Sequence, residues 1–157
     1  ENLAEMQPVV EALLAVSGST AEYVADIRRG RIVGFVILYQ NEVVHYSFLF
    51  LRNKTACILG LDRHSALIGN AFTIPGYRGR RAQPRSVKAR CHLAREAGYK
   101  RIVAETSPDN LASQKGMQKG GMLLLGRMDL ALALTIFVFR WRRPSGFRLW
   151  GMCMEFG

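Results

Sequence analysis

The stretch FTIPGYRGR at residues 72–80 decides how the rest of the chain is interpreted. An apolar run from Ser65 to Ile74 leads into it, and a segment with helical apolar spacing follows from Pro84 to Gly98. A loop that carries glycine and arginine and ends at a helix start offers unpaired backbone N–H groups and a positive dipole end to an anion. Arg78 and Arg80 add forked donors that suit phosphate. A diphosphate ligand would use all of these together; a solvated basic turn is the alternative, which the loop alone does not exclude.

The segments before this loop indicate an antiparallel meander. Two runs of β-type composition flank residues 40–42, a connection short enough for a hairpin. Pro8 interrupts a helical pattern near the N-terminus. The sequence predicts, in order, a kinked or divided helix at Leu3 to Val16, strands at Glu22 to Arg28, Ile32 to Tyr39 and Val43 to Leu51, and further extended segments at Ala56 to Leu61 and Ser65 to Ile74.

The segments after the loop alternate between helix and strand. Proline suits the first turn of a helix and glycine its end, which places one helix between Pro84 and Gly98. Asp109 or Asn110 is the expected N-cap of the next helix, which ends at Gly120-Gly121. A strand at Ile102 to Thr106 separates the two helices, and Met122 to Leu125 with Leu130 to Trp141 are expected to form a closing hairpin. We therefore expect a mixed α/β (α+β) sheet with one crossover, in a single domain over residues 1–157.

The composition is that of a globular protein with one unusual quantity, a formal net charge of +10. Hydrophobic residues make up 49% of the chain, which argues against disorder. The near-apolar run from Leu130 to Phe139 is shorter than the roughly 20 residues that cross a bilayer, so we expect a buried strand and no membrane partner. Three cysteines in no metal-ligand spacing favour a reducing cytoplasm. The chain begins without Met or a signal-peptide pattern, which leaves a truncated N-terminus open.

Two motifs resemble those of the GNAT family of N-acetyltransferases. Residues 72–80 are similar to the family's acetyl-CoA-binding loop, in which a strand is followed by x-Pro-x-x-Arg-Gly-x-Gly-x-Gly/Ala and a helix. The stretch PDNLAS at 108–113, followed by KGGM at 119–122, is similar to the family's Asn-x-x-Ala/Ser helix and its ending. The motifs occur in the family's order, and the resemblance covers roughly Ser65 to Arg127. It implies a GNAT-like acyl-CoA N-acyltransferase fold, acetyl-CoA (CoA) as cofactor and no metal.

The resemblance assigns cofactor-binding roles to three groups of residues. Backbone groups of Phe72, Thr73 and Ile74 would pair with pantetheine, as if it were an added strand. Backbone N–H groups of the loop would hold the diphosphate, and two residues of the last helix would contact the cofactor. The loop residues are Arg78, Gly79, Arg80, Arg81, Ala82 and Gln83, and the helix residues are Asn110 and Ser113.

The sequence departs from the family pattern at three positions. Arg81 and Gln83 stand where the family has its two later loop glycines, which allow close approach of the backbone to phosphate. These residues can still present N–H groups if their φ angles are negative. Met117 stands where many members have a tyrosine that acts as general acid, and a thioether cannot donate a proton. Another group or water must then protonate the leaving thiolate, or catalysis is weakened.

Acetyl transfer by direct attack needs a deprotonated amine and donors for the developing oxyanion. Glu105 is the expected general base, because its strand neighbours the cofactor strand in this family; a surface or salt-bridged carboxylate is the alternative. His45 and His64 are further candidates because their reference pKa lies near neutrality. The backbone N–H of Phe72 or Thr73 would face the oxyanion.

The sequence therefore favours an N-acetyltransferase acting on a small-molecule or peptide amine, as a monomer or, like many similar proteins, a homodimer. Three alternatives remain open. One is a basic nucleic-acid-binding module, because the tail FRWRRP at 139–144 interleaves aromatic and cationic residues. Another is a CoA-binding or acyl-carrier-binding domain with weak or no catalysis. The third takes longer acyl groups from CoA or from an acyl carrier protein.

Overall fold

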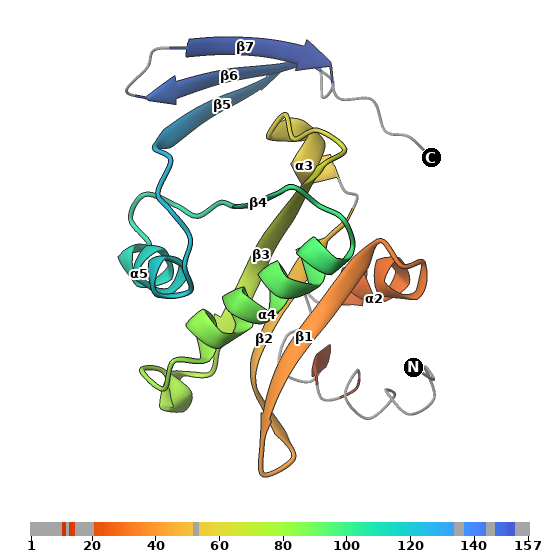
Figure 1. The fold of residues 1–157 in the computed structure, drawn as a ribbon, viewed down its shortest axis with the longest axis vertical. Coiled ribbons are helices and arrows are strands. Elements are labelled where there is room, and N and C mark those ends of the chain that lie inside the picture. Colours follow the sequence, from red (N-terminus) through yellow and green to blue (C-terminus); the bar gives the residue numbers. More distant parts are fainter. Residues whose placement is uncertain are drawn as a thin grey trace.

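The computed structural model describes residues 11, 13–14, 21–51, 54–133, 137–143 and 147–152. Its elements form a four-stranded mixed sheet, a crossover helix, and a separate three-stranded antiparallel sheet (Figure 1). In chain order they are α2 (Ala21–Arg28), β1 (Ile32–Tyr39), β2 (Glu42–Phe50), α3 (Lys54–Ile58), β3 (Ser65–Thr73), a 3-10 turn (Pro75–Tyr77), α4 (Ala82–Glu96), β4 (Arg101–Ala104), α5 (Leu111–Lys119), β5 (Arg127–Ala133), β6 (Phe137–Arg143) and β7 (Phe147–Met152).

The four-stranded sheet has the order β1-β2-β3-β4. Strands β1, β2 and β3 are antiparallel neighbours, whereas β4 runs parallel to β3. The hairpin between β1 and β2 turns at Gln40 and Asn41, both of which have positive φ, the conformation that a two-residue hairpin turn of type I′ requires. The parallel pair needs a crossover, and α4 supplies it. The mixed α/β sheet with one crossover is thereby confirmed.

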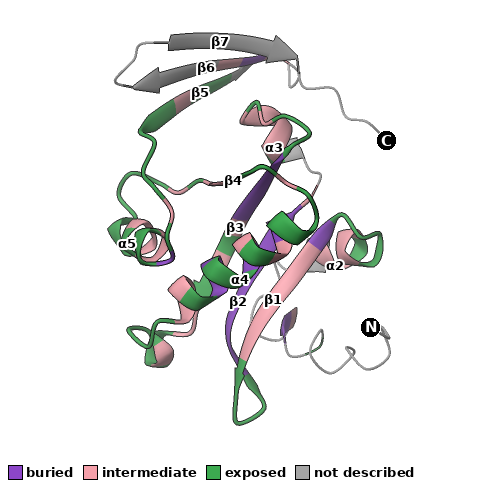
Figure 2. Cartoon of the chain, viewed as in Figure 1, coloured by how far each residue is buried: buried purple, intermediate pink, exposed green. Residues whose placement is uncertain are grey.

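Two apolar layers cover the two faces of this sheet. On one face, α2 and α3 pack over a cluster that includes Phe48, Phe50 and Leu67. On the other, Val87 and Ala94 of α4 pack on strand residues that include Leu49 and Ile68. Figure 2 shows the consequence, because the buried residues concentrate on β2, on the first half of β3 and on the inner side of α4. The central strands are packed on both faces, and α4 shares one of these buried clusters with β3.

Two strands predicted in the first half are helices. The segment Glu22 to Arg28 belongs to α2, because Tyr23 and Ile27, four residues apart, both pack against the sheet. The segment Ala56 to Leu61 contains the end of α3 and a turn at Gly60, whose φ is +70°. In both segments the short apolar runs fitted the two-residue period of a strand as well as the 3.6-residue period of a helix, and packing against the sheet selected the helix.

The C-terminal prediction is also wrong in part. Residues 122–126 form no strand, and Leu123, Leu124 and Leu125 are exposed rather than paired. The run Leu130 to Trp141 is divided between β5 and β6, which pair with Ala133 opposite Phe137. Leu130, expected in a buried strand, is 43% exposed. Periodicity cannot locate the end of a strand inside a run that is almost entirely apolar, so one strand was predicted where there are two.

Parts of the sequence-based expectations fall outside the described residues. The predicted helix from Leu3 to Val16 is described only at residues 11, 13 and 14, where Leu13 is buried in the core. The side chains of residues 140–157, which carry most of the aromatic and cationic tail, are likewise not described. No helix among the described residues is long and apolar enough to span a bilayer.

Candidate functional site

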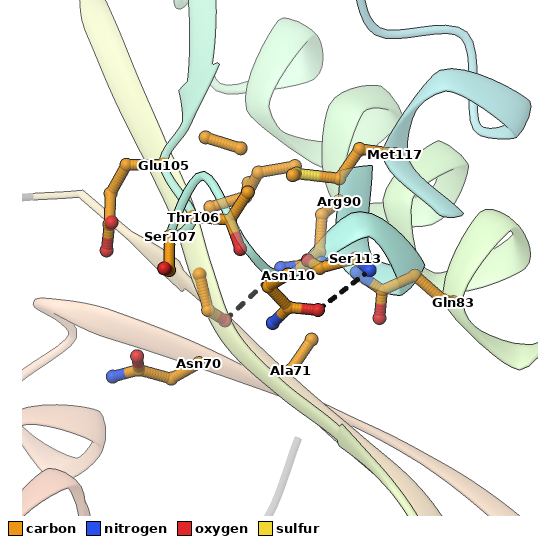
Figure 3. Close-up of a pocket in the computed structure, with 13 residues that line it drawn as sticks. Asn70, Ala71, Gln83, Arg90, Glu105, Thr106, Ser107, Asn110, Ser113 and Met117 are labelled. Carbon is orange, nitrogen blue, oxygen red and sulfur yellow. Dashed lines mark hydrogen bonds between the residues drawn. The ribbon is translucent and has the colours of Figure 1, made fainter. Parts of the chain in front are cut away.

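Strands β3 and β4 separate partway along their length. They pair from Ser65 with Arg101 to Ile68 with Ala104, after which β3 continues to Thr73 while the chain turns from β4 towards α5. A cleft of about 280 Å³ opens at this separation. Figure 3 shows that its walls come from β3, from the residues after β4, from α5 and from α4. The lining residues are Ile68, Gly69, Asn70, Ala71, Gln83, Arg90, Ala104, Glu105, Thr106, Ser107, Asn110, Ser113 and Met117.

A β-bulge shapes the β3 wall of this cleft. The pairs Tyr46 with Phe72 and Phe48 with Gly69 leave two β3 residues, Asn70 and Ala71, opposite one residue of β2. Asn70 has a φ of +46°, and its side-chain amide donates to the Tyr23 hydroxyl of α2. Because a bulge bends its strand, the end of β3 turns away from β4. The sequence did not predict this bulge, although asparagine is the non-glycine residue best suited to positive φ.

The three residues predicted to meet pantetheine lie at the end of this diverging strand. The Ile74 N–H donates to the Val44 carbonyl of β2, so Ile74 faces β2. Backbone groups alternate along a strand, so Thr73 faces the open edge, where its carbonyl accepts from the Arg78 guanidinium at 3.3 Å. Phe72 pairs with Tyr46, and their rings stack at 5.7 Å. Of the three, Thr73 has its backbone polar groups on the open side.

The loop after β3 leads directly into α4. Gly79 and Arg81 both have positive φ, at +78° and +62°, and Arg81 is the residue at which the helix begins. The first helical bond runs from the Arg85 N–H to the Arg81 carbonyl, and no side chain caps the start. The backbone N–H groups of residues 79–83 donate to no described residue. Arg81 therefore adopts the conformation that favours glycine and does not meet the condition of negative φ, whereas Gln83 is helical and does.

The arginines of the loop do not close it. Arg80 lies over the Tyr77 ring, 5.1 Å from its centre, and Arg78 lies 6.0 Å from the centre of the Phe72 ring. Both side chains are exposed, as are Gly79 and Arg81, while Ala82 is half-buried. The start of α4 thus presents free N–H groups and positive charge, and Gln83 carries this surface into the cleft.

The predicted residues Asn110 and Ser113 face the same cleft from α5. The Asn110 side chain accepts from the Ser113 N–H at 3.1 Å, which confirms it as the N-cap (Figure 3). Gln114 donates to the carbonyls of Ser107 and Pro108, at 3.3 and 2.8 Å, and so holds the turn before the helix. The two motifs found in the sequence therefore meet at one site.

Helices α4 and α5 approach closely because α5 has glycine at two contact positions. A Cβ on Gly116 would lie 2.7 Å from the Gln83 side chain, and one on Gly120 would lie 2.6 Å from Val87. Met117, which lies between these two glycines in the sequence, lines the cleft. The position of the family tyrosine thus does border the cleft, although its side chain here has no acidic proton.

The three candidate bases occupy different environments. Glu105, the first residue after β4, is exposed and borders the cleft, and Figure 3 places it well apart from Asn110 and Ser113. His64 is exposed in the turn before β3, at the opposite end of that strand from the cleft. His45 is 1% exposed on β2 and does not line the cleft. Of the three, Glu105 alone is among the lining residues.

A buried polar layer that the sequence analysis missed lies between the sheet and α4. His45 Nδ1 is 2.8 Å from the Thr73 hydroxyl, and its Nε2 has no partner. Ser47 of β2 and Ser86 of α4 share a hydrogen bond beside it. Arg90 is buried on the same side of the sheet. Burial and the charge of Arg90 lower the pKa of His45 to about 4, so this imidazole is neutral at pH 7 but only weakly basic, and it lies outside the cleft.

The described residues offer no metal site, since they contain no group of three or more His, Cys, Asp or Glu placed to hold an ion. The start of α4 instead offers free N–H donors and arginines, and the adjoining cleft adds Arg90 and amide side chains. Such a surface suits an anionic ligand with a polar, extended body.

Comparison with protein families identifies the chain. The model of the acetyltransferase (GNAT) family matches residues 4–122. This chain belongs to the GNAT family of acetyltransferases. The resemblance inferred from residues 72–80 and 108–113 is therefore confirmed, and acetyl-CoA, the expected cofactor, is the acyl donor that the family uses.

Solved GNAT structures share the fold at low sequence identity. An aminoglycoside N-acetyltransferase in complex with CoA superimposes with a TM-score of 0.64 at 19% identity, over 74% of this chain and 87% of that one. An aminoglycoside 6′-N-acetyltransferase from Acinetobacter haemolyticus gives 0.60 at 7% identity, over 77% and 89%. An acetyltransferase from Trypanosoma brucei gives 0.57 at 21% identity, over 85% and 96%. No curated protein matches the chain in sequence.

Proposed function

We propose that this GNAT protein is an N-acetyltransferase that transfers acetyl from acetyl-CoA to a primary amine by direct attack. The observation that carries the proposal is the meeting of both family motifs at one cleft. Gln83, from the start of α4, and Asn110 and Ser113, from α5, line the opening between β3 and β4. The anion-binding surface and the open strand edge are thus continuous, as an extended cofactor with a diphosphate requires.

The diphosphate fits the start of α4. The N–H groups of residues 79–83 have no acceptor within the described chain, and a helix start favours negative charge. Arg78, Arg80 and Arg81 are exposed around them and add positive charge. A ligand anion would satisfy these donors without displacing an existing bond.

The pantetheine arm fits the edge of β3. Beyond Ile68 this edge is paired with no described strand, while the opposite edge is held by β2. The backbone of Thr73 faces the open side, and Ala71 lines the cleft. We propose that Thr73 and Ala71, rather than three consecutive residues, bond the pantetheine amides, because only alternate residues of a strand face one edge.

Glu105 is the proposed general base. Along an extended chain, Ala104 and Thr106 point to one side and Glu105 to the other. Asn70 is directed to the α2 side by its bond to Tyr23. The amine would approach near Glu105 and Asn70, so that the base and the cofactor arm lie on different walls of the cleft. An exposed carboxylate at its edge can receive a proton and release it to water.

The chemical step then balances without a further cofactor. Glu105 removes a proton from the ammonium form, and the amine nitrogen attacks the thioester carbonyl carbon. The new C–N bond forms and the C–S bond then breaks, while backbone N–H groups on the open β3 edge stabilise the oxyanion. The attacking nitrogen gives up its second proton to water as the amide forms, after Glu105 has taken the first. Met117 has no proton to give, so water protonates the departing thiolate.

The acceptor is to be found by assay. Because aminoglycoside acetyltransferases share this fold, amino sugars form the first panel, followed by small amines, amino acids and peptides. A cytoplasmic location and a homodimer stay predictions, as do the single-domain boundaries.

Thermal unfolding with added ligand tests the proposal. A ligand that binds only the native state raises its stability by mass action, by roughly 2.7 kcal/mol at 100 times its Kd. We expect acetyl-CoA to raise Tm, and S-acetylpantetheine, which lacks the diphosphate, to raise it far less. No shift at millimolar acetyl-CoA, together with salt-sensitive RNA binding, would favour the nucleic-acid module instead. A shift without thiol release across the acceptor panel would favour a CoA-binding domain without catalysis.

A further inference from the structure

Arg90 is a buried cation without a carboxylate partner among the residues that the structure describes. It is 1% exposed. One terminal nitrogen, Nη1, donates to the carbonyls of Phe48 and Gly69 at 3.0 and 3.4 Å, and Nε donates to the Ser86 carbonyl at 3.3 Å. All three acceptors are neutral. The charge of Arg90 is therefore met by backbone dipoles alone.

The bulge in β3 explains these bonds but not the charge. Phe48 and Gly69 form the last regular pair before the bulge, and their carbonyls need donors. A neutral amide would supply donors without the cost of burying an unpaired cation. Burial lowers the pKa of the Arg90 guanidinium to about 10, so it stays protonated at neutral pH. Burying the positive charge therefore costs free energy, and bonding to the two carbonyls beside the bulge does not require that charge.

The free end of Arg90 is directed to the cleft. Its second terminal nitrogen, Nη2, donates to no described residue, and Arg90 is one of the lining residues. Figure 3 shows the side chain reaching from α4 towards β3, between Met117 and Asn110. Glu105, the acidic residue of the lining, is exposed and lies apart from it. A small anion entering the cleft would therefore find unused donors and an unmatched charge.

The position of Arg90 shows which part of a ligand it would meet. Arg90 is eight residues after Ala82, which places it roughly 12 Å along α4 from the helix start. It bonds to Gly69, next to the pair Ile68 and Ala104 where the strands separate. A diphosphate held at the helix start is too distant to be its counter-ion. With the cofactor arm lying along β3, as proposed above, the inner end of the cleft holds the acyl thioester.

We propose that Arg90 forms a carboxylate subsite at the inner end of the cleft, and that one of the two substrates carries a carboxylate close to the reacting carbonyl. This proposal rests on the proposed function. The carboxylate has two possible sources: the far end of a dicarboxylic acyl group on CoA, or an amino-acid acceptor. Both would make the same charge-assisted bond to Nη2, and binding measurements separate them.

Two pairs of matched ligands identify the source of the carboxylate. The first pair tests the acyl donor: succinyl-CoA and butyryl-CoA have the same four-carbon chain and differ in a terminal carboxylate or methyl group. The second pair, measured with CoA bound, sets amino acids against the corresponding amino-acid amides. Titration calorimetry on the wild type is expected to show at least about tenfold tighter binding of the carboxylate in one pair. The pair that shows it identifies the source.

Variants tie that preference to Arg90. In Arg90→Gln the preference should fall to within about threefold, while CoA itself binds as in the wild type; Arg90→Lys should retain part of it. Should Arg90→Gln fail to fold, the wild-type pairs and Arg90→Lys still decide. Equal affinities within both pairs, in a wild type that binds CoA, would overturn the subsite alone. A wild type that binds no CoA would overturn the proposed function and the subsite with it.

Discussion

Single residues carry much of the local strain and charge in this protein, and Arg81 is the clearest instance. It is a non-glycine residue at φ +62° where α4 begins, a conformation that costs an L-residue about 1 kcal/mol. Arg81→Gly should therefore raise the free energy of unfolding by about 0.5–1 kcal/mol, measured by urea denaturation.

The matched control for Arg81 is Arg85, an exposed arginine in the first turns of the same helix. Arg85→Gly removes the same side chain at helical φ and should lower stability by about 1 kcal/mol. Equal losses in the two variants would show that the left-handed conformation at Arg81 carries no strain in solution.

Glu105 is the residue on which the proposed mechanism depends. Glu105→Gln keeps the size of the side chain but cannot accept the proton, so kcat should fall about 100-fold or more while the Kd for acetyl-CoA stays within about twofold. Stopped assays of thiol release with the best acceptor measure kcat, and calorimetry measures the Kd for acetyl-CoA. Glu96→Gln, which alters an exposed carboxylate of α4 that pairs with His92, is the control and should leave kcat unchanged. Full activity of Glu105→Gln would exclude Glu105 as the base.

His45 predicts a loss of stability in mild acid. Its pKa is about 4 in the native state and 6.5 in the unfolded chain. Above pH 6.5 both states are neutral and His45 has no effect; between pH 6.5 and 4 the unfolded state alone takes up the proton, so stability falls as pH falls. The whole decline is at most about 3 kcal/mol. His45→Asn should reduce the slope of unfolding free energy against pH in this interval, measured by urea denaturation at a series of pH values.

The residues that sequence reasoning missed are those whose role depends on a partner in space. Ser47, Ser86 and Arg90 look like isolated polar residues in amphipathic segments, and His45 was considered only as a base. Nothing in the spacing of these residues along the chain shows that β2 and α4 bring them together. Asn110 could be found as an N-cap candidate, beside Asp109, because capping is local and follows a short pattern, whereas Ser113 was found through the family motif.

Helices α4 and α5 pack at a distance that only glycine permits. A Cβ at position 120 would overlap Val87. Gly120→Ala should therefore destabilise the protein by about 1–3 kcal/mol, as overpacking of a close contact does. Calorimetric Tm or denaturant midpoints measure this loss.

A double-mutant cycle isolates that contact. Val87→Ala makes room for the new methyl group, so the double variant should be less destabilised than the sum of the two single changes. Gly76→Ala, at a loop glycine with open space around it and no positive φ, is the neutral control. Strict additivity of the changes in unfolding free energy would show that the two helices can move apart without loss of stability.

Elements with a strong local signal were predicted, and those selected by tertiary packing were not. Strands β1 to β3 have long β-branched and aromatic runs, and α4 has a proline near its start and a glycine after its end, so all four were placed within a few residues. Helix α2 is eight residues long, and its two sheet-facing residues satisfy either period. The separation of β3 from β4 could not be predicted, because it depends on a bulge at Asn70 and on where β4 stops.

Across the whole molecule the net charge of +10 sets a response to salt. Like charges destabilise the compact state, and raising NaCl from about 10 to 150 mM shortens the screening length from about 30 to 8 Å. Tm at pH 7 should therefore rise by about 2 °C, while the affinity for acetyl-CoA falls. Near pH 10, close to the isoelectric point of about 10.2, the effect of salt on Tm should disappear. A fall in Tm with salt at pH 7 would show that attractive ion pairs dominate instead.

The unpaired stretch of β3 beyond Ile68 has a consequence for handling the protein. A strand edge that pairs with no described strand is a template on which a strand from another molecule can add, which is how many edge strands begin to aggregate. An occupant of that edge removes the template. Protein purified without CoA should therefore precipitate sooner on storage and warming than protein supplied with it, and light scattering would follow the difference.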